Sequence, residues 1–191
     1  LRRPPTRYCA RSSSAAVTSL AADLSQFHPR GVEEIHHVLQ KYRLGHKNYF
    51  LTIGRLESKK NIATLARAFE IFKKTRGLGD PFELVLVGAP GFGFEKMKPY
   101  LERSPVKDHI KTLGWIDQAD IPALVAGALL FLFPSWYEGF GIPNLEAMAS
   151  GTALITSDIP AHREVCADAA LFVLPSEPPA WAQAMRRLVE N

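Results

Sequence analysis

The sequence predicts a doubly wound, Rossmann-like α/β fold, in which a parallel sheet carries helices on both faces. Short apolar stretches and longer amphipathic stretches alternate about six times along the 191 residues, a pattern typical of successive βαβ units. The apolar stretch at 128–133 is unbroken, as expected of a strand that is buried on both faces. Loops that follow the strands of such a sheet gather at one edge, where ligands bind.

The predicted elements begin with a helix over 32–43, where charged and apolar residues recur at helical spacing. Asn61 is placed to cap a helix over 62–75 that has one apolar stripe. Pro143 at the first helical position and Gly151 at the stop delimit a later helix. The other predicted elements are strands over 49–54, 82–87, 110–113, 128–133, 153–156 and 170–174, and helices near 94–103, 120–126, 160–165 and 178–190.

The stretch 134–151 joins a glycine-bearing loop to the start of a helix. Gly139 and Gly141 let the backbone approach a ligand closely and take positive φ angles. The unpaired N–H groups at the helix start suit an anion or a polar oxygen. Glu138 before the loop and Glu146 one turn into the helix are good acceptors for hydroxyl groups, as on sugars and riboses. A tight turn with two solvated glutamates is the alternative interpretation.

The longer pattern around this loop is more specific. Seven residues separate Glu138 from Glu146, Phe140-Gly141 lies inside, and Leu145 precedes the second glutamate. This arrangement resembles the E-x7-E signature of the group 1 (family 4) retaining glycosyltransferases, which have two Rossmann domains in the GT-B arrangement. The resemblance implies transfer of a hexose from a nucleotide-diphospho-sugar to an acceptor, with retention at the anomeric carbon.

A second motif follows the strand over 49–54. Gly54-Arg55-Leu56 and, shortly after, Lys60-Asn61 resemble the family's G-R-L-x-x-x-K-N loop. A nucleoside diphosphate leaving group concentrates negative charge, which a cation must offset as the sugar bond breaks. Arginine offers a planar fork and lysine a mobile point charge. By itself the motif could be a solubilising loop, but its position on the same sheet edge favours a function.

Two further strand ends supply candidate contacts. Gly114-Trp115-Ile116 ends the strand over 110–113, and in the family the residues after this strand touch the nucleotide base, largely through backbone groups. Trp115 either stacks on that base or packs in the core. Gly88 opens a glycine-rich loop that could close over phosphates, but its spacing is not that of a dinucleotide site. His162 could face the sugar, although a solvated histidine is the simpler expectation.

The resemblance assigns a role to each matching residue. Glu138 would bind hydroxyls of the donor sugar, and Glu146 would bind the ribose hydroxyls. Backbone N–H groups of Phe140, Gly141 and Ile142 would reach sugar and phosphate. The predicted catalytic residues are Arg55, Lys60 and Glu138, and the predicted donor-binding residues are Gly54, Gly88, Trp115, Ile116, Phe140, Gly141, Ile142, Leu145 and Glu146.

Neither a metal nor another cofactor is expected. The chain has no D-x-D pattern, and the adjacent His36 and His37 lack partners at metal-ligand spacing. The donor would be a UDP-, GDP- or ADP-sugar, with the base left open. Two cysteines, Cys9 and Cys166, give no disulfide framework, which favours a reducing, cytoplasmic location.

The positive charge lies mainly at the N-terminus. The chain has 23 lysines and arginines against 19 acidic residues, and four of these arginines fall within the first eleven residues. The remainder is neutral, which argues against a nucleic-acid-binding face. We expect residues 1–19 to be a linker or a truncated N-terminal segment that could contact anionic lipid at the inner membrane face. Residues 20–191 would form the donor-binding domain.

The resemblance covers about residues 20–190, the C-terminal half of such an enzyme. The acceptor, a sugar or a lipid-linked glycan, would be held by an N-terminal domain that these residues do not include, so this chain alone is expected to be inactive. Two alternatives stay open. One is a nucleotide-sugar isomerase or phosphorylase of the same fold, and the other is a non-catalytic nucleotide-sugar-binding module.

Overall fold

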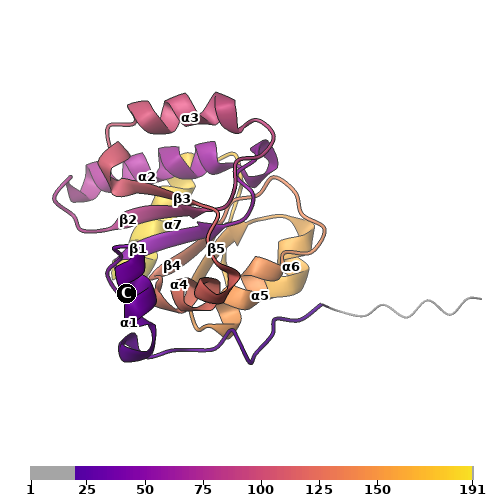
Figure 1. Ribbon diagram of the computed structural model, residues 1–191. Coiled ribbons are helices and arrows are strands. Elements are labelled where there is room, and N and C mark those ends of the chain that lie inside the picture. Colours follow the sequence, from indigo (N-terminus) through magenta and orange to yellow (C-terminus); the bar gives the residue numbers. More distant parts are fainter. Residues whose placement is uncertain (1–19, 191) are drawn as a thin grey trace, which may run out of the picture.

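Six parallel strands form one sheet, and helices cover both of its faces in the computed structural model, which describes residues 20–190 (Figure 1). The strands are β1 (Tyr49–Ile53), β2 (Glu83–Val87), β3 (Ile110–Gly114), β4 (Leu130–Phe133), β5 (Ala153–Ser157) and β6 (Leu171–Val173). The α-helices are α1 (Val32–Lys41), α2 (Ile62–Arg76), α3 (Phe94–Arg103), α4 (Ile121–Gly127), α5 (Ile142–Ala149), α6 (Pro160–Cys166) and α7 (Pro178–Glu190). Short 3-10 turns lie at Ser58–Lys60, Lys107–His109 and Gln118–Asp120.

The strand order is β3-β2-β1-β4-β5-β6, with every neighbouring pair parallel. The chain therefore starts in the middle of the sheet, moves outward to β3, and then crosses to β4 on the other side of β1. This is the strand order of a doubly wound fold, in which ligands bind at the crevice between the two halves. The predicted fold class is confirmed, and the predicted elements are all present with ends shifted by a few residues.

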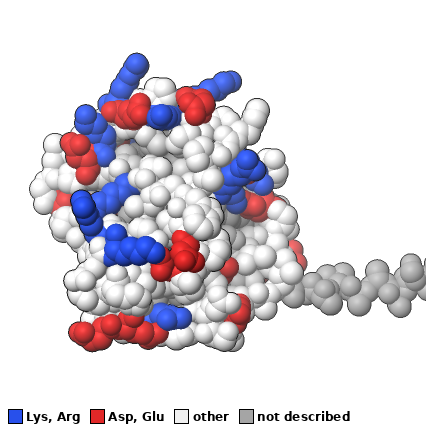
Figure 2. Space-filling model, viewed as in Figure 1, with Lys and Arg blue, Asp and Glu red and all other residues white. Residues whose placement is uncertain are grey.

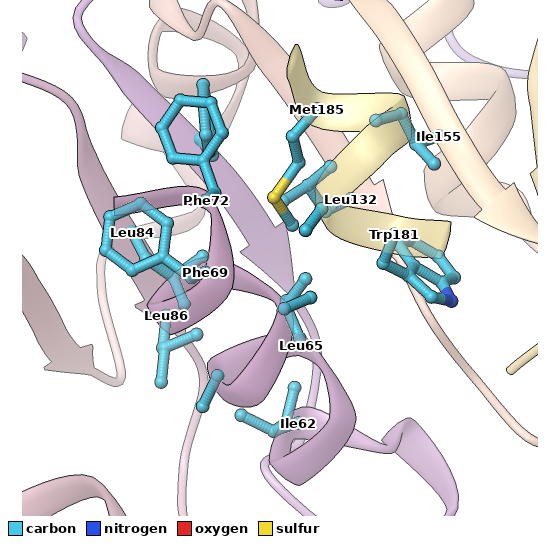
Figure 3. Close-up of a cluster of buried hydrophobic side chains, with 14 of the residues drawn as sticks. Ile62, Leu65, Phe69, Phe72, Leu84, Leu86, Leu132, Ile155, Trp181 and Met185 are labelled. Atoms are coloured by element: carbon cyan, nitrogen blue, oxygen red, sulfur yellow. The ribbon is translucent and has the colours of Figure 1, made fainter. Parts of the chain in front are cut away.

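Two hydrophobic layers pack on opposite faces of the sheet. Side chains alternate along β1, so Phe50 points into the layer under α2, α3 and α7, whereas Tyr49 and Leu51 point into the layer under α1 and α4. Figure 3 shows the first layer, where Phe69 of α2 and Trp181 of α7 lie over strand residues. Because both faces of the sheet are covered, the inner strand β4 is wholly apolar and buried, which explains the unbroken run at 128–133. The edge strand β3 is only partly buried and carries Lys111 and Thr112.

Asn61 does not cap α2 as predicted. It occupies the position before the helix with a φ angle of 54°, but its side chain makes no capping bond. Instead its Nδ2 donates to the carbonyl oxygens of Pro134 at 3.0 Å and Pro175 at 2.7 Å. Buried carbonyl groups need donors, and these two carbonyls lie beyond the ends of β4 and β6. Asn61 therefore ties the start of α2 to the ligand-binding edge of the sheet.

Charges of both signs are interspersed over the face shown in Figure 2, with no continuous basic stripe on it. Within residues 20–190, every helix is too short or too polar to cross a membrane. The predicted linker at residues 1–19 lies outside the described residues.

Candidate functional site

Two loops meet where the direction of the strand order reverses. The loop at 54–61 leaves β1, and the loop at 134–141 leaves its neighbour β4. The backbone N–H of Trp136 donates to the carbonyl oxygen of Lys59 at 2.8 Å, which fastens one loop to the other. Both predicted motifs therefore lie at the crevice that doubly wound folds use for ligands.

An ion pair joins the two motifs. Lys60 Nζ lies 2.6 Å from Glu138 Oε1, although the two residues are 78 positions apart in the sequence. Only 16% of the Lys60 side chain and 12% of the Glu138 side chain is exposed. Ser135 Oγ donates to the same carboxylate oxygen at 2.8 Å, and the ammonium also lies 4.6 Å from the centroid of the Phe133 ring. These contacts hold the Lys60–Glu138 pair in one geometry, and both side chains are largely shielded from solvent.

Glycines end the three strands on one side of this pair. Gly54 after β1 and Gly88 after β2 both have φ angles of 143°. A Cβ on Gly88 would lie 1.9 Å from the carbonyl oxygen of Gly54, and Gly88 donates to the carbonyl of Gly114 at 2.8 Å. Glycine is required for this close approach. The result is a partly exposed backbone surface beside Lys60, whose Cε would lie 3.4 Å from a Cβ on Gly54.

Arg55 differs from Lys60 in its surroundings. Its side chain is exposed and makes neither an ion pair nor a hydrogen bond within residues 20–190. The aliphatic part of the Arg55 side chain packs against the loop after β2, where a Cβ on Gly91 would lie 2.9 Å from Arg55 Cγ. Of the two predicted phosphate contacts, Arg55 is thus available and Lys60 is already paired.

The loop before α5 presents unpaired backbone donors. Gly141 has a φ angle of 105°, which confirms the positive φ predicted there, whereas the positive φ predicted for Gly139 is wrong. No side chain caps the helix that follows. The backbone N–H groups of Phe140, Gly141 and Ile142 donate no hydrogen bond within the described residues. No acidic side chain occupies the first turn of α5. Such a helix start attracts anions and polar oxygens.

Glu146 lies one turn further along α5, next to the half-buried Leu145. Its carboxylate is half-buried and has no side-chain partner within the described part of the chain. Burial raises the pKa of Glu146 above its usual range. A carboxylate that gives up hydration without gaining a partner is a candidate for ligand binding.

The end of β3 offers a ligand one exposed side chain. Trp115 is 72% exposed, so the core-packing alternative is wrong, whereas stacking on a base stays a prediction. Ile116 is only 5% exposed and packs in the layer under α1 and α4. Any contact of Ile116 with a ligand would have to use its backbone.

His162 is a buried residue of this site, so the expectation of a solvated histidine is wrong. Its Nδ1 lies 2.8 Å from Thr156 Oγ1 and 3.1 Å from the carbonyl of Ser157, and burial lowers its pKa. Its Nε2 has no partner, and a Cβ on Gly141 would lie 3.1 Å from His162 Cδ2. The buried His162 ring thus packs against the turn at Gly141. Its spacing of four from the buried Cys166 on α6 was the available sequence signal.

Neither a metal cluster nor the hollow along β6 and α7 marks the candidate site in the described part of the chain. Within residues 20–190, no three histidine, cysteine, aspartate or glutamate side chains gather in a way that could hold a metal ion. A hollow of about 970 Å³ lies along β6 and α7, but none of the predicted site residues lines it. The chemistry of the strand ends, rather than the size of a cavity, therefore locates the candidate site.

Comparison with known proteins shows the family of this chain. The family model described as "Glycosyl transferases group 1" matches residues 36–191. O-antigen chain mannosyltransferase B of Escherichia coli is 37% identical over 161 residues, which cover 84% of this chain and 42% of that protein. The chain therefore spans about two fifths of the length of this curated relative.

Solved structures show the same fold. The C-terminal domain of a glycosyl transferase group 1 family protein (LpcC) from Francisella tularensis has a TM-score of 0.73 at 24% identity, covering 90% of this chain and 89% of that one. Anabaena Alr3699/HepE, in a structure with UDP and glucose, has a TM-score of 0.77 at 21% identity, covering 90% of this chain and 46% of that one. Both solved structures thus contain a domain with the same fold as this chain.

Proposed function

Because the chain belongs to the group 1 glycosyl transferases, we propose that residues 20–191 form the nucleotide-sugar-binding half of a retaining hexosyltransferase that needs no metal. The observation that carries the proposal is the contact between Lys60 and Glu138 at the crevice between the halves of the sheet. It brings together a cation that would suit a diphosphate and a carboxylate that would suit sugar hydroxyls.

The two predicted cations suit a diphosphate. Arg55 and Lys60 follow β1, next to the partly exposed backbone of Gly54 and Gly88. As the bond to the sugar breaks, negative charge grows on the leaving diphosphate, and these cations would offset it. The open N–H groups at the start of α5 would add donors on the other side. The protein would thereby supply the positive charge that a divalent ion supplies elsewhere.

The two glutamates suit the two ends of a nucleotide sugar. Glu138 lies in the crevice, where the loop from β4 would place the sugar, and Glu146 lies one turn into α5. We assign Glu138 to hydroxyls of the sugar and Glu146 to hydroxyls of the ribose. Trp115, exposed at the end of β3, would stack on the base.

The donor sugar is proposed to be a hexose. The curated relative is named a mannosyltransferase, and the Anabaena structure contains UDP and glucose. The acceptor is proposed to be a sugar or a lipid-linked glycan, held by an N-terminal domain at the cytoplasmic face of a membrane. Retention and membership of family 4 rest on the E-x7-E pattern. Nuclear magnetic resonance of the first-formed glycoside would show the anomeric configuration.

A titration in excess EDTA tests the function and the independence of metal together. Purified chain is titrated with UDP-glucose, GDP-mannose and ADP-glucose by calorimetry, with and without EDTA. We expect one of the three nucleotide sugars to bind, with an affinity that EDTA does not change. If none of the three donors binds, the proposed function is wrong. If EDTA removes the binding, a metal takes part.

A product assay separates the proposed activity from its alternatives. Transfer requires an acceptor held within reach of the anomeric carbon. The 191 residues alone are therefore expected to bind the donor without making glycoside, and to gain transfer when the N-terminal domain of a relative is supplied. A sugar phosphate product would instead indicate a phosphorylase, and binding without any product under both conditions would indicate a binding module.

Replacing Arg55 by alanine is expected to weaken a nucleoside diphosphate by about three- to tenfold at low salt, because an exposed cation is lost from the phosphates. The loss should shrink as the salt concentration rises, since screening already weakens that interaction. Lys60→Ala should also weaken the diphosphate, but with less dependence on salt, because the Lys60 side chain is largely buried. Calorimetry with UDP, GDP or ADP at two salt concentrations measures the effect.

Arg103→Ala is the matched control, because Arg103 is an exposed arginine at the far end of α3. This variant should bind like the wild type. The plain nucleoside should also bind the Arg55 variant almost normally. A nucleoside that loses as much affinity as the diphosphate would show that Arg55 does not contact phosphate.

A further inference from the structure

We propose that the Lys60–Glu138 pair makes the site discriminate between a nucleotide sugar and the free nucleoside diphosphate that remains after transfer. The inference rests on the proposed function, and it concerns how one contact treats two ligands. Both side chains are assigned to ligand groups, Lys60 to the diphosphate and Glu138 to the sugar. In the free protein they are instead 2.6 Å apart and satisfy each other.

A free diphosphate must take Lys60 away from its partner. Glu138 would then keep the hydrogen bond from Ser135 but lose its counter-charge, while only 12% of its side chain is exposed. A desolvated carboxylate without a cation is unfavourable. The affinity for the diphosphate is therefore lowered by the free energy needed to separate the pair.

A complete nucleotide sugar removes that cost. Its hydroxyl groups can donate to Glu138 at the moment when Lys60 turns toward the phosphates, so both groups exchange one partner for another. The carboxylate stays near its place because the buried Ser135 donates to it. The lysine is the mobile member, since its stem lies along Gly54, which has no side chain to obstruct it.

The free energy of separating an ion pair applies to Lys60 and Glu138 but not to the other proposed ligand contacts. Arg55 is exposed and has no partner within residues 20–190, so it reaches a phosphate without losing a contact. Glu146 likewise has no side-chain partner in the described part of the chain. After transfer the sugar leaves Glu138, and the carboxylate competes with the diphosphate for Lys60. The pair would thus hasten release of the product.

The test compares wild type with Glu138→Gln and Glu138→Ala by calorimetry. Each is titrated with UDP, GDP and ADP and with UDP-glucose, GDP-mannose and ADP-glucose. Loss of the carboxylate should raise the affinity for the free diphosphate by about three- to tenfold. It should lower the affinity for the nucleotide sugar by about tenfold. The alanine variant is included because a glutamine oxygen can still accept from Lys60.

Repeating the Glu138 substitutions in a Lys60→Ala variant distinguishes the effect of the ion pair from simple repulsion between Glu138 and the phosphates. In Lys60→Ala, removal of the carboxylate should give no gain for the diphosphate, because no lysine is left to be freed. Glu83→Gln is the matched control. Glu83 pairs with Lys111 at 2.8 Å at the start of β2, on the opposite edge of the sheet, and its loss should change neither affinity.

The outcomes are distinct. If both Glu138 variants bind the free diphosphate no better than the wild type, the inference is wrong. It is equally wrong if the gain persists in the Lys60→Ala background, since the carboxylate then repels the diphosphate directly. Failure of the proposed function would appear earlier, as a wild type that binds no nucleotide, and it would overturn the inference as well. Thermal unfolding of each variant checks that it is folded.

Discussion

Gly88→Ala is expected to lower the free energy of unfolding by about 3 kcal/mol or more. The φ angle of 143° at Gly88 is unfavourable for any residue with a side chain. In addition, the new Cβ would lie 1.9 Å from the carbonyl oxygen of Gly54, a backbone atom that cannot turn away. The ends of β1 and β2 would have to separate. Urea denaturation, with its midpoint and slope compared with those of the wild type, measures the loss.

Gly54→Ala is the control for backbone strain alone. Gly54 has the same φ angle, but the nearest atom to its new Cβ would be Lys60 Cε at 3.4 Å, the flexible end of a side chain. This substitution should cost about 1–3 kcal/mol, the range expected for strain without a clash. Equal losses in the two variants would contradict the close approach of Gly88 to the Gly54 carbonyl.

Glu146→Ala is expected to weaken free nucleoside diphosphate and nucleotide sugar alike, each by about tenfold to a hundredfold. The ribose is common to both ligands, and Glu146 is a half-buried acceptor with no side-chain partner in residues 20–190. Calorimetry with matched ligand pairs measures the two losses. If only the nucleotide sugar were weakened, Glu146 would contact the sugar, and its assignment to the ribose would be wrong.

The same residue predicts a dependence on pH. Because burial raises the pKa of Glu146, its carboxylate becomes protonated at a higher pH than an ordinary glutamate does as the pH falls. Protonation removes acceptor capacity, so wild-type affinity should fall with falling pH while this group takes up its proton. The fall should be absent from Glu146→Ala over the same range. Parallel pH profiles in the two proteins would mean that another group is responsible.

The fold could be predicted because burial on both faces of a parallel sheet leaves a plain trace in the sequence. Every strand of that kind must be apolar along its whole length, as 128–133 is. The helices between strands show one apolar face, as 62–75 does. These are local signals. Because all six strands are parallel, the loops that follow them lie at one edge of the sheet.

The residue types of the candidate site were also visible in the sequence, because glycines, cations and carboxylates recur just after strands. Their partners were not. Asn61 had a local role available as a cap, but two carbonyls from the ends of β4 and β6 take its side chain. His162 looked like a surface residue, yet α6 packs it under the Gly141 turn.

The sequence alone was enough for the alternation of strands and helices and for the loops that carry the chemistry, since both follow from neighbours along the chain. The pairing of Lys60 with Glu138 across 78 residues depended on the tertiary structure. So did the contrast between that lysine and the unpaired Arg55. Which polar groups meet is decided by the competition among all the donors and acceptors that packing brings together, and this competition has no counterpart in local sequence.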